Sequence, residues 1–588
     1  MKVSTSARGS VCLIAMTAFV ACGGKTVLAP EETGVPTDTG TDTAEPLPDT
    51  REPPIDVTPI PDGPEPIASA KIDLLFVIDN SMSMADKQAD LARRIPELIA
   101  GLTNPTSKKR ATDLHVAVIT SSLGSHGTSA CDPSVTNNHN NDHGHLLPRA
   151  GEGGGSGWAV GADGAPTPAA CPAPVTATAL SWVADPGSDP KAMFSGSAGS
   201  STLQTAASCV VRSAAEDGCG YEETLESMYH FLIDPAPYAT AEVKCTFGVS
   251  GDACGSNKIE VKGLDTEILS QRAAFLRPDS SVVIVVLSDE NDFSLKPASL
   301  NWLPWGYGAG QFQRGWKACE GIDDAFEPES ASEFADLHAK NCYSCFENAA
   351  DPGGNCVVPW PKDKLNNDPD GRNLRGFHMV QRFGYNFLWS RDRYVKALTK
   401  TTAIGSDGKE GPNPLFASGK RTPGNVMFAA IVGVPGSLVN DASGAPKPLT
   451  ASDWNKIAGP AAGRDPHMVE SIAPRVALGI KKFAGDRSID PVNGGDRDVY
   501  DGDDLQYACI GLRTDPTGGY ECSTPGSDTK NPLCGPSGKQ PYFKAYPGLR
   551  HLRVARELGS SGFVASICDA NLSGALRALV DRVQPLLK

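Results

Sequence analysis

Residues 71–83 read KIDLLFVIDNSMS, and the prediction of the fold starts from them. The first eight of these residues are mostly apolar, as in a strand that is buried on both faces of a parallel sheet. The pattern Asp79-x-Ser81-x-Ser83 follows directly. Ligands of a parallel sheet bind beyond the carboxyl ends of its strands, so this loop faces the expected binding crevice. One carboxylate and two hydroxyls at alternate positions can converge on a hard cation such as Mg²⁺.

The rest of the chain alternates between strand-like and helical patterns. Apolar residues at helical spacing follow at 91–102, where Pro96 predicts a kink or a second helix start. Further apolar runs typical of strands lie at 114–120, 281–288, 425–434 and 563–568. Helical patterns lie at 222–233, 378–399, 469–483, 549–558 and 572–587. This alternation predicts an α/β fold, a doubly wound and mostly parallel sheet with helices on both faces.

A second acidic residue stands at a comparable place, because Asp289 follows the apolar run VVIVVL at 282–287. With this pairing the chain resembles the von Willebrand factor type A (VWA) domain family. That family has Asp-x-Ser-x-Ser after a hydrophobic first strand and an Asp after the fourth. The strand at 426–434 and the helix and turn at 553–562 also resemble the family. The resemblance is organised around residues 71–588, although the insertions match nothing in it.

The resemblance implies a metal-ion-dependent adhesion site (MIDAS). Ser81 and Ser83 would bind the cation directly, and Asp79 and Asp289 partly through water. One coordination position would stay open for an acidic residue of a protein partner. Mg²⁺ is the expected ion, with Ca²⁺ or Mn²⁺ as alternatives. The simpler alternative is that the two serines only cap a helix N-terminus.

The family also supplies a Thr from a second loop, usually as Gly-x-Thr before a helix. Here the corresponding stretch, 218–228, reads GCGYEETLESM. Thr224 precedes a Ser-Met pair as the family Thr precedes its small and apolar pair, so Thr224 is the expected ligand. Glu222 or Glu223 could replace it, which would add charge and shift the preference towards Ca²⁺.

The N-terminus predicts export and a lipid anchor. An apolar run at 11–21 follows Lys2 and Arg8 and is too short to span a bilayer, as in a signal peptide. It ends at Cys22 in a pattern that resembles a bacterial lipobox, so we expect a signal peptide at 1–21 and lipidation of Cys22. Cleavage as an ordinary secreted protein is the alternative. Residues 23–70 hold ten prolines and ten acidic residues, which predicts a disordered stalk from Cys22 to residue 70. The lipoprotein resemblance implies the outer membrane, with the body periplasmic or surface-exposed.

Composition agrees with export. A net charge of −16 argues against nucleic-acid binding, which needs a basic surface. Of sixteen cysteines, fourteen remain beyond the signal peptide and the anchor, enough for up to seven disulfides. A zinc site at Cys342, Cys345 and Cys356 is the weaker alternative. We expect the disulfides to hold insertions on a single sheet, at approximately 123–202, 234–264, 294–375, 435–468 and 484–546.

Two other polar clusters could hold metals. His139, Asp142, His143 and His145 could form a transition-metal site, although loop histidines are more often solvent-exposed. Acidic residues surround Gly502 and suggest calcium, but their spacing does not fit an EF-hand, and a solvated acidic turn is the alternative. These acids are Asp496, Asp498, Asp501, Asp503 and Asp504.

No Gly-x-Ser-x-Gly elbow, zincin motif or Walker A loop is present, so an enzyme is not expected. The sequence favours an envelope lipoprotein whose VWA-like domain binds a protein partner, for example in adhesion, through a divalent cation. One alternative is an exported metal-dependent hydrolase that uses Asp79, Asp289, Glu290 and Asp292. Another is a structural scaffold with a degenerate metal site.

Overall fold

The described part of the chain begins at residue 65. The computed structural model describes residues 65–104, 106–126, 131, 139–147, 179–183, 203–243, 259–296, 315–322, 333–345, 356, 376–471, 475, 505–513, 533–534 and 540–588. The predicted signal peptide, Cys22, most of the stalk, the acidic cluster around Gly502 and most of the helix predicted at 469–483 therefore lie outside the described residues.

A six-stranded, mostly parallel sheet forms the centre. Its strands are β1 (Lys71–Ile78), β2 (Asp113–Thr120), β3 (Leu180–Val183), β6 (Ser281–Leu287), β9 (Val426–Val432) and β12 (Gly562–Ser566). They lie in the order β12-β9-β6-β1-β2-β3, and only β3, at one edge, runs antiparallel to its neighbour. Every residue of β6 and β9 is buried, which is why these strands read as unbroken apolar runs.

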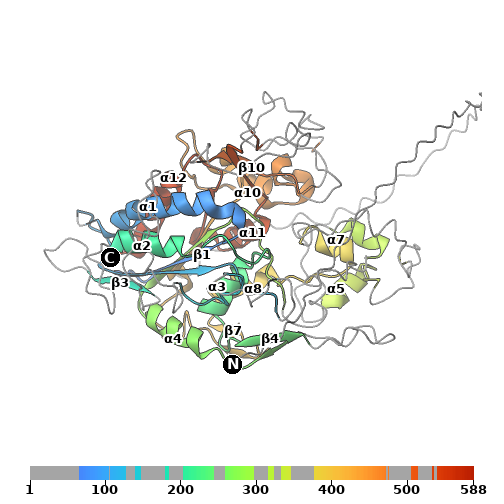
Figure 1. Cartoon of the computed structure of the whole chain (residues 1–588), viewed down its shortest axis with the longest axis horizontal. Helices are drawn as coiled ribbons and strands as arrows, with labels where there is room; N and C mark the ends of the chain where they lie inside the picture. Colours follow the sequence, from blue (N-terminus) through green and yellow to red (C-terminus); the bar gives the residue numbers. More distant parts are fainter. Residues whose placement is uncertain are drawn as a thin grey trace, which may run out of the picture. The chain divides into compact units, whose positions relative to one another are not determined.

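Helices cover both faces of this sheet (Figure 1). On one face the apolar core joins the strands to α1 (Ala85–Thr103), α2 (Leu203–Arg212) and α12 (Ser573–Val583). On the other face a second core contains α3 (Thr224–Leu232), α4 (Thr266–Phe275), α8 (Arg391–Thr399), α10 (Ala451–Ala458) and α11 (Leu549–Glu557). The prediction of an α/β fold with helices on both faces of a mostly parallel sheet is confirmed.

Two predicted helical segments differ in part from the prediction. Helix α1 runs through Pro96 as one helix, so the second helix start is absent there. Pro96 has no N–H for the carbonyl of Ala92, and the hydroxyl of Ser208 in α2 donates to that oxygen instead, at 2.6 Å. The segment 378–399 is not one helix, because α7 (Met379–Phe383) ends at Gly384, whose φ of 66° is left-handed.

Smaller elements lie between these. Three antiparallel pairs are β4 (Thr240–Val243) with β5 (Ile259–Lys262), β7 (Thr402–Ile404) with β8 (Glu410–Pro412), and β10 (Cys509–Leu512) with β11 (Tyr542–Ala545). Two short helices are α5 (Glu333–Ala339) and α9 (Gly436–Val439). Single 3₁₀ turns are η1 (Met82–Met84), η5 (Lys317–Gly321), η7 (Pro423–Asn425), η8 (Ala461–Gly463), η9 (Pro466–Met468), η13 (Gly559–Ser561) and η14 (Gln584–Leu586).

Disulfides fasten several of these segments. The bridges among the described residues are Cys131–Cys219, Cys319–Cys342, Cys345–Cys356 and Cys509–Cys568. Because Cys342, Cys345 and Cys356 are all oxidised in two of these bridges, they offer no thiolates for the zinc site considered above. In the described part of the chain, no helix has both the length and the apolar character that a bilayer-spanning segment requires.

Candidate metal centre

The centre lies where the strand order reverses. The chain runs outward from β1 through β2 to β3, then crosses to β6 on the other side of β1 and continues outward to β9 and β12. The strands β1 and β6 therefore flank the point at which ligands bind in open α/β sheets. Asp79 directly follows β1, and its N–H donates to the carbonyl oxygen of Leu287, the last residue of β6, at 2.9 Å. This bond holds the predicted motif beside the end of β6. The Asp79 side chain is fully buried there.

Four of the five predicted ligands form one connected group. The N–H of Ser81 donates to Oδ1 of Asp79 (2.8 Å), and the hydroxyl of Ser288 donates to its Oδ2 (2.7 Å). The Ser81 and Ser83 hydroxyls lie 3.1 Å apart, and the Ser83 hydroxyl donates to Oδ1 of Asp289 at 3.0 Å. The side chain of Ser81 makes no helix-capping hydrogen bond. A simple capping role therefore does not account for these serines.

Negative charge dominates the group. Burial, together with the charges of Asp289 and Glu290, raises the pKa of Asp79 to about 7. Burial also raises the pKa of Asp289, but the charges of Lys87 and Lys544 and the hydrogen bonds from Lys87 and Ser83 outweigh that effect and hold it below its ordinary value. Asp289 is therefore ionised at neutral pH, and its charge opposes ionisation of Asp79. A bound cation would relieve this repulsion.

A lysine that the sequence analysis missed reaches the same group. The Nζ of Lys87, in α1, donates to Oδ2 of Asp289 and to the carbonyl oxygen of Ser83, both at 2.7 Å. It also lies 4.3 Å from the ring centre of Phe543. The residue is only 3% exposed. Lys87 lies four residues after Ser83, and residues four apart lie on the same side of a helix. This spacing could have indicated that Lys87 lies beside the serine.

The residues of the second loop point in different directions. The Thr224 hydroxyl lies 2.6 Å from Nε2 of His551 and 3.3 Å from Oδ1 of Asp292, so it belongs to a separate polar cluster. The Glu223 carboxylate pairs with His126 at 3.0 Å. The Glu222 carboxylate is buried, and burial and then the charges of Glu290, Asp79 and Asp289 raise its pKa well above the ordinary value. Glu222 is therefore coupled electrostatically to the centre, whereas the hydroxyl of Thr224 is hydrogen-bonded elsewhere.

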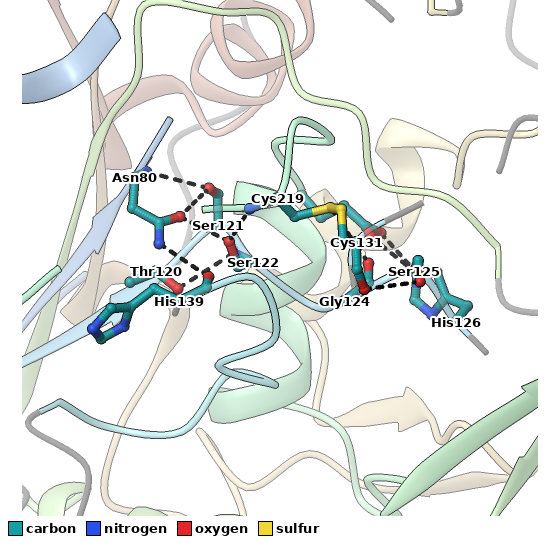
Figure 2. The surroundings of a disulfide bond; sticks show 11 residues. Asn80, Thr120, Ser121, Ser122, Gly124, Ser125, His126, Cys131, His139 and Cys219 are labelled. Atoms are coloured by element: carbon teal, nitrogen blue, oxygen red, sulfur yellow. Dashed lines mark hydrogen bonds and ion pairs between the residues drawn. A yellow bond between two sulfur atoms is a disulfide. The ribbon is translucent and has the colours of Figure 1, made fainter. Parts of the chain in front are cut away.

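Asn80 anchors the loop from within the motif (Figure 2). Its side-chain oxygen accepts from the hydroxyls of Ser121 (3.2 Å) and Ser122 (2.8 Å), which follow β2, and its amide donates to the carbonyl oxygen of His139 at 3.2 Å. The Ser122 hydroxyl also accepts from the N–H of Cys219, one half of the Cys131–Cys219 disulfide. The disulfide and the end of β2 therefore share one network with the motif.

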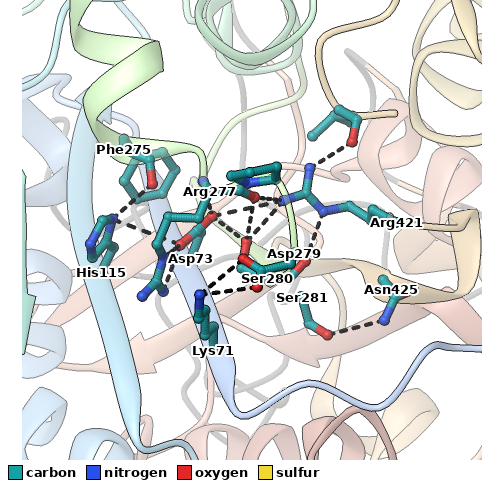
Figure 3. A network of polar contacts seen from close by, with 12 residues as sticks. Lys71, Asp73, His115, Phe275, Arg277, Asp279, Ser280, Ser281, Arg421 and Asn425 are labelled. Carbon is teal, nitrogen blue, oxygen red and sulfur yellow. Dashed lines mark hydrogen bonds and ion pairs between the residues drawn. The ribbon is translucent and has the colours of Figure 1, made fainter. Parts of the chain in front are cut away.

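A buried carboxylate within β1, Asp73, serves a structural role near the opposite end of the strand from Asp79 (Figure 3). Asp73 accepts from Nε of Arg277 at 2.7 Å and from the Ser280 hydroxyl, and Arg421 donates to the carbonyl oxygen of Ser280 at 2.8 Å. Burial raises the pKa of Asp73, but the adjacent Arg277 guanidinium opposes this. Asp73 is thus compensated by protein groups, which explains a charged residue inside an apolar strand.

The two remaining carboxylates of the hydrolase alternative, Glu290 and Asp292, have basic partners. Glu290 pairs with Lys544 at 3.3 Å, and Asp292 pairs with Nε of Arg550 at 3.1 Å. Asp292 also accepts from the N–H of Leu225 at 2.9 Å, which fixes it to the start of α3. These contacts occupy groups that a two-metal site would need.

The predicted histidine cluster divides into two. His139 is buried and pairs with Asp142 at 3.0 Å. His143 and His145 are half-buried and lie instead beside Asp265. His143, His230 and Asp265 each offer one ligand atom, and these atoms all lie within 4.8 Å of one another. The structure thus contains a group of ligand-type side chains of which the sequence indicated only His143.

Comparison of the chain with protein-family models, with curated proteins and with solved structures finds no match.

Proposed function

We propose that the described domain is VWA-like and binds a protein partner through a divalent cation. Asp79, Ser81, Ser83 and Asp289 would hold the ion, with Glu222 in place of Thr224. The observation that carries this proposal is the connected group of oxygen atoms at the ends of β1 and β6. Oxygen atoms are the ligands of Mg²⁺, and Ca²⁺ or Mn²⁺ would suit the same set.

The donor set fits a cation on electrostatic grounds. Asp79, Asp289 and Glu222 are buried side chains whose charges repel one another, and a dication would favour their ionised forms. A metal with an open coordination position acts as a Lewis acid for an incoming oxygen. The acidic side chain of a partner would supply that oxygen, which makes recognition dependent on the cation.

The N-terminal sequence extends the proposal to location. A lipidated Cys22 and a proline-rich, acidic stalk would hold the domain at a distance from a bacterial membrane, which we propose to be the outer membrane. A binding domain on such a tether could meet a partner in the periplasm or at the cell surface.

The Lys87–Asp289 pair supports a second candidate, a scaffold without a bound metal. An ammonium group at 2.7 Å from Asp289 compensates that carboxylate without an external cation. In this case the oxygen group would be a buried structural network, and Mg²⁺ would have no effect on stability.

Thermal unfolding distinguishes the two candidates. We compare purified wild type with Asp79→Ala, each with excess Mg²⁺ and with EDTA. A ligand at a hundred times its Kd stabilises the native state by about 2.7 kcal/mol, so Mg²⁺ should raise the wild-type Tm by several degrees. The Asp79→Ala variant should not respond. An equal response of both proteins would exclude Asp79 from the site, and no response of the wild type would favour the scaffold.

Partner binding needs a separate test. Wild type and Asp79→Ala, immobilised at equal density, are exposed to envelope extract with Mg²⁺ or with EDTA. We expect retained proteins that depend on both Mg²⁺ and Asp79, and a purified candidate should then bind with a Kd that EDTA weakens at least roughly tenfold. Retention of the same proteins in all four conditions would contradict cation-dependent recognition.

A further inference from the structure

Three separate elements bring metal-ligand side chains together away from the motif. His143 lies in the segment after β2, His230 lies in α3, and Asp265 is the N-cap of α4. The rings of His143 and His230 pack edge to face with centroids 4.8 Å apart, and Nε2 of His143 lies 3.8 Å from Oδ2 of Asp265. None of these three residues belongs to the proposed oxygen site.

His230 provides an independent indication of a missing partner. The residue is fully buried, and neither ring nitrogen has a hydrogen-bond partner. Its Nδ1 lies 3.7 Å from Oδ2 of Asp234, which is beyond hydrogen-bond distance. A buried polar atom without a partner costs roughly 1–3 kcal/mol, so native proteins rarely leave one in place. A metal ion bound to one ring nitrogen would satisfy it.

We propose that His143, His230 and Asp265 bind a Zn²⁺ ion. Two imidazoles and one carboxylate are a ligand set that Zn²⁺ accepts, and three protein ligands leave a fourth position for water. In a tetrahedral site with bonds of about 2.0–2.1 Å, ligand atoms lie roughly 3.4 Å apart. The three atoms of this group lie within 4.8 Å of one another, so a shift of each side chain by about an ångström would close the site.

The surrounding contacts fit this assignment. Nε2 of His145 lies 2.8 Å from Oδ2 of Asp265, an arrangement that orients a ligating carboxylate. Oδ1 of Asp265 accepts from the N–H of Ile268, which fixes the side chain at the start of α4. Nε2 of His143 now contacts the carbonyl oxygen of Tyr238 at 2.8 Å. Zinc binding therefore requires a small rotation of this ring or ligation through Nδ1.

Zinc titration of the purified full-length protein tests the proposal. Excess Mg²⁺ is kept present to occupy the proposed oxygen site, so that Zn²⁺ binding reports on His143, His230 and Asp265. A chelating indicator gives the Zn²⁺ affinity. Wild type should bind one Zn²⁺ per chain at this site. His230→Phe keeps an aromatic ring but removes both nitrogens, and Asp265→Asn keeps a helix-capping side chain but removes the charge. Each should weaken Zn²⁺ binding at least roughly tenfold.

Asp465→Asn is the matched control. Asp465 is also an N-cap that accepts from a backbone N–H, and it pairs with His467 at 3.1 Å, but it lies outside the histidine group. This control and Asp79→Ala should bind Zn²⁺ as wild type does. If His230→Phe fails to fold, Asp265→Asn decides. The proposal is overturned if wild type binds no Zn²⁺, if Asp265→Asn binds it normally, or if Asp79→Ala or the control loses it.

Co²⁺ provides a structural readout on the same proteins. Four-coordinate Co²⁺ absorbs visible light far more strongly than six-coordinate Co²⁺. Because the proposed zinc site is tetrahedral, Co²⁺-loaded wild type should show the strong spectrum, and Asp265→Asn should lose it. A weak spectrum in the wild type would contradict a histidine site of this geometry.

Discussion

The ammonium nitrogen of Lys87 lies 2.7 Å from Oδ2 of Asp289, and both side chains are almost completely buried. This lysine is a cation that the chain itself supplies to the oxygen group. An incoming Mg²⁺ would therefore meet a carboxylate that already has a positive partner. The Mg²⁺ affinity proposed for this group should therefore depend on how easily the pair of Lys87 and Asp289 is broken.

Replacing Lys87 with methionine separates the two effects of the pair. Without a metal, the variant leaves Asp289 buried without its ammonium partner, which should cost about 3 kcal/mol of unfolding free energy in EDTA. With a metal, loss of the competing charge should tighten Mg²⁺ binding roughly tenfold, because one positive charge no longer repels the ion. Denaturant unfolding in EDTA and calorimetric titration with Mg²⁺ measure the two quantities.

Lys71→Met is the control for this prediction. Lys71 lies at the opposite end of β1 and forms an exposed pair with Asp279 at 3.0 Å, so its loss should change stability by less than about 1 kcal/mol and leave Mg²⁺ binding unchanged. If Lys87→Met binds Mg²⁺ more weakly than wild type, the lysine supports the metal site and does not compete with it.

The fold could be predicted because the strands carry a strong local signal. A run such as 282–287 is apolar at every position, as expected of a strand that is buried on both faces. Pro96 shows the limit. The carbonyl oxygen of Ala92, to which Pro96 cannot donate, accepts instead from the hydroxyl of Ser208, a residue 112 positions after the proline. No local pattern carries that information.

The site was predicted less completely, because the directions of several of its side chains depend on residues that are distant in the sequence. Asp79 and Asp289 follow strands, so the sheet alone places them together. Thr224 is the first residue of α3, and its hydroxyl direction depends on Asp292 and His551, which come from distant segments. Lys87 reads as one more charged residue of an amphipathic helix. Its burial follows from packing against Phe543, which lies near the end of the chain.

The choice between Glu222 and Thr224 can be decided by two substitutions. Glu222→Gln removes a carboxylate that interacts with Asp79, so it should weaken Mg²⁺ binding several-fold or more. Thr224→Val removes the hydroxyl that contacts His551, so it should lower the free energy of unfolding by about 1–2 kcal/mol and leave Mg²⁺ affinity unchanged. Calorimetric Mg²⁺ titration of both variants checks this. Weaker binding in Thr224→Val alone would restore Thr224 as the ligand.

His551 should make stability depend on pH. Burial lowers its pKa to about 4, from an ordinary value of 6.5. The unfolded chain therefore takes up a proton near pH 6.5, whereas the folded protein resists it until about pH 4. The stabilising contribution is complete above pH 6.5 and is lost as pH falls towards 4, by about 3 kcal/mol in all.

His551→Gln isolates this contribution. Glutamine can still hydrogen-bond to the hydroxyl of Thr224 but does not titrate. Urea unfolding of both proteins between pH 4 and pH 7 should give a curve for the variant that is flatter by up to about 3 kcal/mol. Parallel curves would show that His551 is not the group whose protonation destabilises the fold.

The hydrogen bond between Ser208 and the carbonyl oxygen of Ala92 should matter only because of Pro96. In wild type, Ser208→Ala leaves a buried carbonyl without a partner, which should cost about 1–2 kcal/mol of unfolding free energy. Pro96→Ala restores an N–H that can donate to Ala92 within α1. In that background Ser208→Ala should cost less, and the double-mutant cycle should give a coupling of about 1 kcal/mol.

Thr103→Val is the control, because the Thr103 hydroxyl donates to the carbonyl oxygen of Ile99 at 2.7 Å in the same helix without involving the proline. A coupling for Thr103 as large as that for Ser208, or none for Ser208, would show that the serine does not compensate for the proline.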